Sequence, residues 1–417
     1  MRKLLKCYIL LCFAWLFAFT CLFSNVYAKS YIISPLPLPQ QEILNISTEK
    51  CSQSCLLDHF NKGQLFSFVA FFEPYMDNVE LRSKLSEVLG ALGIMDMAIP
   101  SSLEGNAKIK LALLMPKKII GRYSVSSIDT ILAYLMARGS DFVFEIFDTG
   151  DESSAKLEAT YKQIVENGYD FVIAILTSKG AQEFVKLDIS LPTYLPTINK
   201  RHIQDTHFSK ELTFGGIDYE AQIELLLTLA GDKPIITYND NSFRGADLGA
   251  MVKAKSQNVI LEEVIDSQSA TMFSQKLEKH EELIDESVIF FNTPVMKTGL
   301  MASQLALSSS VPDKLLSTQI NFDPSLLLLI QKDDRKNLFI ANVIHNANAQ
   351  LVEYVALLGG DLRYDWVNYA TAIGVEQLIL GRINLKARFF TEGIKDAQVE
   401  YVNRIYKSDA KKFYEYR

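Results

Sequence analysis

Short apolar runs that alternate with helix-like segments are the feature that most constrains this chain. Runs at residues 109–115, 142–147 and 171–176 are rich in β-branched and aromatic residues, and each is too short to be a core helix. A segment with apolar residues at helical spacing follows each run, as in parallel strands joined by crossover helices. The region 108–199 therefore predicts an α/β unit built on a parallel sheet.

A second block repeats this alternation and extends it to the end of the chain. We expect helices at 219–230, 243–256, 271–284, 296–307, 348–358 and 365–380 around strands at 234–238, 259–265, 288–291, 315–320 and 337–344. A terminal hairpin is expected around Ser408 and Asp409. Two such blocks predict two α/β lobes, joined near residues 215 and 320, with a cleft between them.

Residues 1–28 have the pattern of a secretory signal. Arg2, Lys3 and Lys6 precede an apolar run at 7–23, and residues 26–28 offer a small-residue cleavage site. We therefore expect export across the inner membrane into the periplasm, with the mature chain starting directly after the signal.

Two alternatives to cleavage remain open. The apolar run is near the lower length limit for crossing a bilayer, so an uncleaved N-terminal anchor is the first alternative. A lipoprotein site at Cys21 is the second, although Phe19 and Thr20 are larger than the residues that such a site prefers. No other stretch of the sequence is long and apolar enough to span a membrane.

The charge balance excludes two classes of partner. Removal of residues 1–28 takes away three positive charges and no negative one, so the formal net charge of −7 becomes −10. Nucleic acids and anionic lipids are bound through basic patches. We therefore expect neither as a partner.

The mature chain keeps two cysteines, Cys51 and Cys55. Two cysteines four residues apart in an exported chain predict one small-loop disulfide, which the periplasm permits. The histidines, at positions 59, 202, 207, 280 and 345, are scattered, and no Cys and His set completes a zinc site. We therefore expect no metal and no cofactor.

Residues 29–106 differ from the rest of the chain. A proline-rich lead-in at 31–41 is followed by an aromatic stretch at 60–72 and by helical spacing of leucines at 81–92. Residues 98–106 have the composition of a linker. The pattern predicts a small, mostly helical appendage held by the disulfide, whose apolar content indicates that it packs against the main body or a partner.

Motifs for catalysis are missing from the sequence. It contains no nucleophile elbow, Walker loop, dinucleotide fingerprint or zinc-binding His pair in a suitable context. We therefore expect a protein that is not an enzyme.

The order of elements resembles that of the type I periplasmic binding proteins, the family of leucine/isoleucine/valine-type solute receptors and their relatives. Five segments carry the resemblance: FVIAILTSKGAQEF (171–184), LPTINKRH (195–202), LTFGGIDYEAQ (212–222), IITYNDNSFRGADLGAMVK (235–253) and the closing VNRIYKSDAKKFYEYR. It covers residues 107–417 and implies a first lobe of 107–216 with 321–385 and a second lobe of 217–320 with 386–417.

The resemblance also implies which residues contact a ligand. Amino-acid receptors of the family hold the ligand carboxylate with a hydroxyl and backbone N–H groups at a helix N-terminus after the third strand, and with the end of the next strand. The matching positions in this chain are Thr177, Ser178, Thr197 and Asn199. The aromatic residues that cover the ligand match Tyr123 and Phe243.

The position that binds the ligand amine departs from the family pattern. Such receptors place an acid after the strand expected at 288–291, but this chain has Asn292 and Thr293 there. An amino acid would lose a charge-assisted hydrogen bond of roughly 1.5–3 kcal/mol. The resemblance therefore leaves a common amino acid in doubt as the ligand.

These candidates also have purely structural interpretations. Thr177 and Ser178 are placed to cap the helix that follows, and Asp218 to cap the helix at 219–230. Tyr123 and Phe243 fit ordinary packing within each lobe, and the acid at 240 fits a turn before the helix at 243–256. The sequence leaves these alternatives open.

Two functions remain after these exclusions. The first is a periplasmic receptor that traps a small polar ligand, of the amino-acid kind, between two lobes for an ABC-type permease or a sensor. The second is a protein-binding module for cell-wall synthesis on the same fold, because WVNYATAIGVEQLI (366–379) resembles a segment of the lipoprotein activators of penicillin-binding proteins.

Overall fold

The computed structural model describes residues 51–72, 79–91, 109–139, 141–205, 207–344, 347–380 and 388–417. The expected signal, the proline-rich lead-in, the linker at 98–106 and His345 lie outside these residues. The chain divides into two compact units, Met1–Ile99 and Pro100–Arg417. Each unit is described by itself.

In the first unit the described residues form three helices, α2 (Gln53–Asn61), α3 (Leu65–Phe71) and α4 (Val79–Ala91). Leu56 of α2, Phe68 of α3 and Leu85 of α4 pack into one buried cluster. The Sγ atoms of Cys51 and Cys55 lie 1.97 Å apart beside this cluster. The expected helical appendage is therefore present in the part of this unit that the structure describes.

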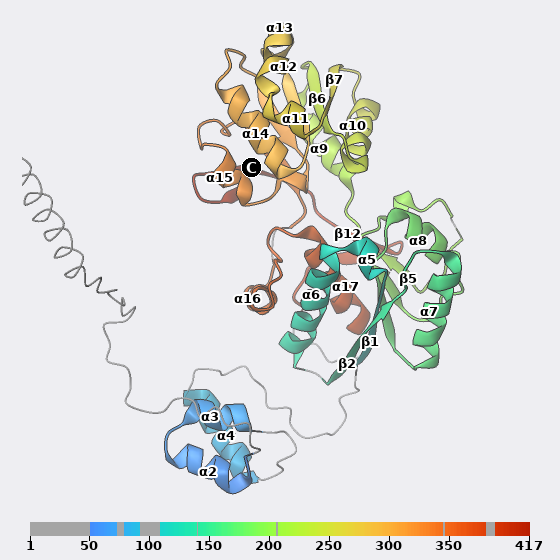
Figure 1. Ribbon diagram of the computed structural model, residues 1–417, viewed down its shortest axis with the longest axis vertical. Helices are drawn as coiled ribbons and strands as arrows, with labels where there is room; N and C mark the ends of the chain where they lie inside the picture. The colour runs from blue at the N-terminus through green and yellow to red at the C-terminus, as the bar shows by residue number, and fades with distance from the viewer. Residues whose placement is uncertain are drawn as a thin grey trace, which may run out of the picture. The chain divides into compact units, whose positions relative to one another are not determined.

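The second unit contains two sheets, one in each lobe (Figure 1). In the first sheet the order is β11-β12-β5-β4-β3-β1-β2. Its strands are β1 (Ile109–Met115), β2 (Phe142–Asp148), β3 (Phe171–Ala174), β4 (Thr193–Leu195), β5 (Leu212–Phe214), β11 (Gly393–Lys395) and β12 (Gln398–Glu400). The first five are parallel to one another.

The second sheet repeats this order as β14-β13-β10-β9-β8-β6-β7. Its strands are β6 (Ile235–Asp240), β7 (Val259–Ile265), β8 (Val288–Asn292), β9 (Lys314–Ser317), β10 (Leu338–Asn342), β13 (Arg404–Ser408) and β14 (Phe413–Glu415). Strands β13 and β14 pair antiparallel, which confirms the expected terminal hairpin.

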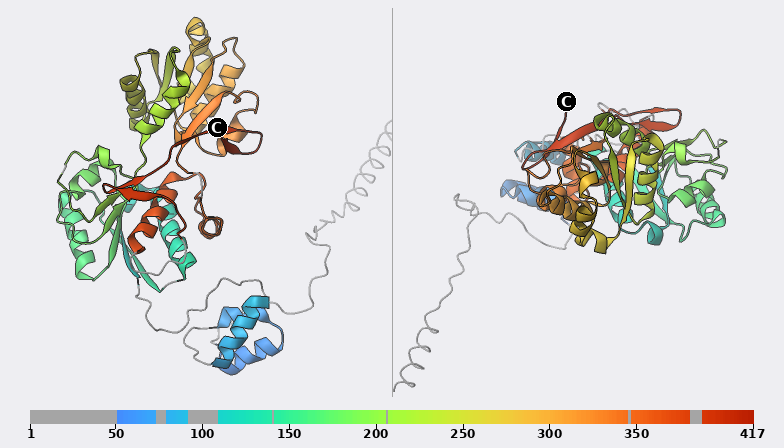
Figure 2. Two further views of the ribbon diagram at one scale, coloured as in Figure 1. Left: turned by 180° about the vertical axis from the view of Figure 1, so that it is seen from behind. Right: turned by 90° about the horizontal axis from the view of Figure 1, so that it is seen from above.

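Helices lie on both faces of each sheet (Figures 1 and 2). Those of the first lobe are α5 (Lys117–Ile120), α6 (Arg122–Arg138), α7 (Ser154–Glu166), α8 (Ser178–Phe184), η1 (Lys200–His202), α16 (Ala349–Leu357) and α17 (Trp366–Ile379). Those of the second are α9 (Tyr219–Ala230), α10 (Phe243–Lys255), α11 (Ser267–Thr271), α12 (Phe273–Lys279), α13 (Glu281–Ile284), α14 (Val295–Ala306), η2 (Gln319–Asn321) and α15 (Ser325–Leu329).

The alternation of side chains along β1 explains why the sheet needs helices on both faces. Leu111 and Leu113 join a core cluster with Ile131 of α6, whereas Ala112 and Leu114 join a separate cluster with α7 and α8. A strand buried on both faces reads as a continuous apolar run, because successive side chains point in opposite directions. The prediction of two α/β lobes with mostly parallel sheets is confirmed.

The chain passes between the two sheets three times. It crosses after β5, returns after β10 and crosses again between β12 and β13. We expected the return near residue 320, but β10 pairs with β9 in the second sheet, so residues 321–342 belong to the second lobe. We also assigned 386–417 to the second lobe, but β11 and β12 extend the first sheet.

Local differences from the expected elements are small. The single helix expected at 271–284 is divided into α11, α12 and α13. Among the helices that the structure describes, none has both the length and the apolar character needed to cross a bilayer.

Candidate functional site

The carboxyl edge of the first sheet contains a carboxylate that belongs to the chain itself. Glu152 follows β2, and one of its oxygens accepts a hydrogen bond of 2.7 Å from the backbone N–H of Thr177. Its other oxygen accepts from the Thr177 hydroxyl. The side chain of Glu152 is 9 % exposed. An internal carboxylate thus occupies the Thr177 donors, which the resemblance assigns to the carboxylate of a ligand.

A glycine in α8 allows this close approach. A Cβ atom built on Gly180 would lie 2.4 Å from the carboxyl carbon of Glu152, closer than side-chain atoms pack. Thr177 is the N-cap of α8, and its hydroxyl accepts from the Gly180 N–H at 3.3 Å. The helix-cap interpretation of Thr177 is therefore confirmed, and its backbone N–H and hydroxyl both donate to Glu152. Ser178, the next residue, is exposed.

The end of β4 lies against the end of β3. The Thr197 hydroxyl donates to the carbonyl of Leu176 at 3.1 Å, which places Thr197 beside the Thr177 turn. The Asn199 side chain donates to the carbonyl of Gly216 at 3.0 Å, and its Oδ1 accepts from the Arg201 N–H at 3.0 Å. Asn199 therefore fixes the first crossing segment between the lobes.

A surface cavity of about 440 Å³ lies beside these crossing segments. Asn199, Arg201, Asp218, Gln398 and Tyr401 are among the residues that line it. Arg201 and Asp218 form an ion pair of 2.5 Å on its wall, and Asp218 also caps α9 through the Ala221 N–H. The cap interpretation of Asp218 is confirmed.

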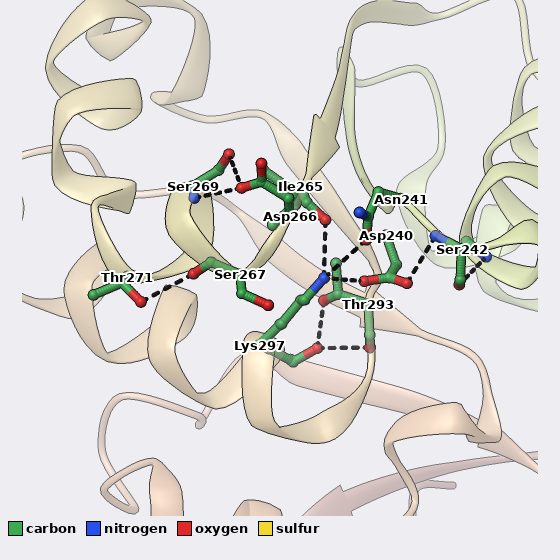
Figure 3. Close-up of polar contacts among 12 residues, drawn as sticks. Asp240, Asn241, Ser242, Ile265, Asp266, Ser267, Ser269, Thr271, Thr293 and Lys297 are labelled. Atoms are coloured by element: carbon green, nitrogen blue, oxygen red, sulfur yellow. Dashed lines mark hydrogen bonds and ion pairs between the residues drawn. The ribbon is translucent and has the colours of Figure 1, made fainter.

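The carboxyl edge of the second sheet contains an ion pair (Figure 3). The ammonium group of Lys297, on α14, donates to a carboxylate oxygen of Asp240 at the end of β6. It also donates to Asn241 Oδ1 and to the carbonyl of Ile265, each at 3.2 Å. The side chains of Lys297 and Asp240 are 16 % and 7 % exposed. The carboxylate of Asp240 is therefore neutralised within the protein.

Burial alone would raise the pKa of Asp240. The hydrogen bonds from Lys297 and from Ser242 outweigh burial and hold that pKa below its ordinary value. The Ser242 N–H donates to Asp240 Oδ1 at 3.0 Å, so Asp240 also forms the turn that the sequence predicted before α10. This carboxylate stays ionised at neutral pH.

Asn292 and Thr293, the candidates for an amine contact, are buried. Asn292 donates to Asn239 Oδ1 at 2.8 Å, and the Thr293 hydroxyl lies 2.7 Å from that of Thr298. The carbonyl of Thr293 accepts from Asn321 at 3.1 Å. Both residues belong to a network of buried carboxamides and hydroxyls that joins the strand ends.

Tyr123 and Phe243, the candidate aromatic residues, each stand at the beginning of a helix. Tyr123 lies in the first turn of α6 and is 36 % exposed, and Phe243 begins α10 and is 80 % exposed. Such exposure contradicts the interpretation of Phe243 as lobe packing. The candidates therefore fall into two groups, one at the carboxyl edge of each sheet.

Sequence reasoning missed Glu152 and Lys297. Glu152 stands in a loop after β2, and the loops that follow parallel strands meet at one edge of a sheet. The position of Glu152 in the loop after a strand could therefore have indicated that an acid lies beside Thr177. Lys297 had a comparable signal, because it lies in the first turn of the helix that follows β8, at the same edge as Asp240.

The comparisons with known proteins identify the fold. No protein-family profile and no curated protein matches the chain. An ABC transporter substrate-binding protein from Sphaerobacter thermophilus matches with a TM-score of 0.54 at 15 % identity, over 74 % of this chain and 96 % of that one. A branched-chain amino acid ABC transporter protein from Thermus thermophilus, with bound valine, matches with a TM-score of 0.53 at 13 % identity, over 75 % and 96 %.

A third structure with this fold has a different description. The C-domain of LpoA from Haemophilus influenzae, described as a regulator of PBP1A, matches with a TM-score of 0.50 at 10 % identity, over 74 % of this chain and 100 % of that one. The described part of the second unit therefore has the type I periplasmic binding protein fold. Identities this low show the fold alone, and proteins with both functions share it.

Proposed function

We propose that this chain is an exported two-lobe binding protein whose principal ligand is another protein of the periplasm, not a free amino acid. The observation that carries the proposal is the position of Glu152. Its carboxylate accepts from the N–H and the hydroxyl of Thr177, two of the groups that the resemblance assigns to an amino-acid ligand.

An amino acid gains little from this site. To bind Thr177, its carboxylate must displace that of Glu152, so hydrogen bonds to one charged group replace those to another. Each such bond contributes about 1.5–3 kcal/mol to stability, and the exchange leaves a net gain near zero. Asp240, at the end of β6, is not available to the amine of the ligand either, because it is paired with Lys297.

The partner that we propose is a penicillin-binding protein. LpoA, whose C-domain has the same fold, is described as a regulator of PBP1A. We further propose that residues 1–28 direct export and are removed, so that the mature chain acts in the periplasm. In that compartment Cys51 and Cys55 are expected to form a disulfide.

A ligand screen tests the negative half of this proposal. The chain from Lys29 onward is heated with each amino acid and with small carboxylates at millimolar concentration. A ligand at 100 times its dissociation constant adds about 2.7 kcal/mol, a shift of a few degrees. We expect no such shift. A reproducible stabilisation by one amino acid, lost in Thr177→Ala, would overturn the proposal.

Photo-crosslinking in the native cell tests the positive half. A photoreactive amino acid is placed at Phe243, Leu357 or Leu307, which are 80 %, 83 % and 89 % exposed. Fluorescent penicillin then labels penicillin-binding proteins covalently. We expect an adduct that carries both the chain and the fluorescent label, formed only after irradiation. If no position gives a labelled adduct, the partner is wrong.

A second candidate function is a receptor for a solute without a carboxylate. The exposed ring of Phe243, at the carboxyl edge of the second sheet, favours it. This function predicts stabilisation by a neutral or cationic solute that weakens in both Phe243→Ala and Tyr123→Ala. Stabilisation of that kind, without a labelled adduct, would replace the first proposal with the second.

A further inference from the structure

Three side chains that bind transition metals lie together in the first unit. Ligand atoms of Cys51, Cys55 and His59 are all within 4.8 Å of one another. Cys51 and His59 are each 7 % exposed, and Cys55 is half-buried. Cys55 and His59 lie four residues apart in α2 and therefore share one face of that helix, and Cys51 stands directly before its N-cap, Ser52.

The neighbours of His59 orient its ring for such a role. Its Nδ1 lies 2.6 Å from the side-chain oxygen of Gln64. An amide oxygen only accepts hydrogen bonds, so Nδ1 carries the proton and Nε2 keeps a free lone pair. The ring of Phe71 stacks on the imidazole, with 5.6 Å between centroids and 11° between planes. Metal-binding histidines are commonly fixed by this kind of second hydrogen bond.

We propose that the reduced form of this unit binds Zn²⁺ through the thiolates of Cys51 and Cys55 and through Nε2 of His59, with water as the fourth ligand. A borderline-soft ion suits two sulfur ligands and one imidazole. Zinc-bound sulfur and nitrogen atoms lie about 3.3–3.8 Å apart in a tetrahedral site. The ligand atoms of Cys51, Cys55 and His59 already lie within 4.8 Å of one another, and they can reach these distances once the two sulfur atoms separate.

The disulfide and the metal site exclude each other, because they use the same two sulfur atoms. A dithiol reductant transfers two electrons and two protons to the Cys51–Cys55 bond and becomes a disulfide itself. Zn²⁺ then replaces the two thiol protons, which are released to solvent. The first unit thus binds this metal only in its reduced form, and oxidation to the disulfide releases it.

Metal titration of the full mature chain tests the proposal. The chain from Lys29 onward contains only Cys51 and Cys55, so every thiolate signal comes from them. Co²⁺ added to the reduced chain should give a thiolate-to-cobalt charge-transfer band and tetrahedral d–d bands at one equivalent, and Zn²⁺ should remove both. The oxidised chain should give neither band. Equal binding by both forms would overturn the proposal.

Variants separate this site from adventitious binding. Cys51→Ser and His59→Gln should each weaken Zn²⁺ binding at least tenfold, and Gln64→Leu about 10- to 100-fold through loss of the second hydrogen bond. His202→Gln, an exposed histidine of the other unit, is the matched control and should bind as the unaltered chain does. Unchanged affinity in His59→Gln contradicts the proposed ligand set.

X-ray absorption on the unaltered zinc complex avoids dependence on how the variants fold. The proposal requires two sulfur ligands at about 2.3 Å and the remaining ligands, nitrogen and oxygen, at about 2.0 Å. A spectrum with nitrogen and oxygen neighbours alone would overturn it.

Discussion

The carboxyl edges of the two sheets each hold a buried acid, but they hold it differently. Glu152, at the edge of the first sheet, is bound by the neutral N–H and hydroxyl donors of Thr177. Asp240, at the edge of the second, is paired with the ammonium group of Lys297. Among the described residues, Glu152 has no cation paired with it. Asp240 and Lys297 together carry no net charge.

This difference determines which edge can exchange its acid. Neutral donors bind any carboxylate of suitable size, so another carboxylate can replace that of Glu152 at little cost. Removal of Asp240 instead leaves Lys297 as a poorly solvated cation, which is strongly unfavourable. The first edge is therefore a site of potential exchange, and the second joins α14 to the end of β6 as a structural element.

The largest effect is expected from breaking the ion pair. Lys297→Met leaves the Asp240 carboxylate mostly buried with few remaining donors, and should lower the free energy of unfolding by about 2–3 kcal/mol, between the values for surface and fully buried pairs. Urea denaturation measures this loss. The double variant with Asp240→Asn should lose less than the sum of the single losses. A loss below about 0.5 kcal/mol would mean that solvent screens the pair.

The second effect is smaller and should respond to added carboxylate. Glu152→Ala leaves both Thr177 donors without their acceptor, and should lower the free energy of unfolding by about 2 kcal/mol. Because the donors are neutral, acetate should raise the melting temperature of this variant more than that of the unaltered chain.

Two matched variants control this experiment. Glu158→Ala removes the same charge from an exposed position of α7 and should change stability by less than about 0.5 kcal/mol. Lys297→Met should show no selective rescue by acetate, since its edge already holds a carboxylate. If acetate raised the melting temperature of all variants equally, the two edges would not differ in their ability to exchange a carboxylate.

Local pattern was sufficient to predict most of the fold. Residues 109–115 and 259–265 were expected as strands and form β1 and β7 with the same bounds. The hairpin of β11 and β12 was not expected, because each strand has three residues and β12 joins the sheet through Gln398 paired with Phe214. A strand this short contains too few residues to establish a period, and its partner is distant in the sequence.

The candidate site could be predicted only in part. The sequence identified Thr177 through its motif and its position before a helix. It did not indicate which side chain accepts the hydrogen bonds that Thr177 donates. Glu152 lies 25 residues earlier, and only folding brings the two loops together. The four-residue spacings from Cys51 to Cys55 and His59 were visible in the sequence, but the histidines were counted across the whole chain and this local pattern was overlooked.

The close contact between Gly180 and the Glu152 carboxyl group can also be tested. In the middle of a helix, Gly→Ala normally stabilises by about 0.5–1 kcal/mol. Gly180→Ala should instead destabilise the chain by about 1–2 kcal/mol, because its Cβ would overlap the Glu152 carboxyl group. In a Glu152→Ala background the same change should become neutral or stabilising. Melting curves of the four chains measure this reversal, and the same sign in both backgrounds would show that Glu152 is not the obstacle.

The smallest effect is a pH dependence that belongs to the second edge. The pKa of Asp240 is lower in the folded protein than its ordinary value of 3.8, so the folded state binds this proton more weakly than the unfolded chain does. Its contribution to stability is therefore complete above about pH 5 and is lost as the pH falls through 3.8 toward the folded pKa.

Asp240→Asn isolates this contribution from those of other carboxylates. The stability difference between the unaltered chain and Asp240→Asn, from urea denaturation at a series of pH values, should stay constant at neutral pH and shrink below about pH 5. In a Lys297→Met background the loss on acidification should be smaller, because the hydrogen bond that lowers the folded pKa is gone. A difference that is independent of pH would mean that the shape of Asp240, not its charge, stabilises this edge, and the contrast between the two edges would disappear.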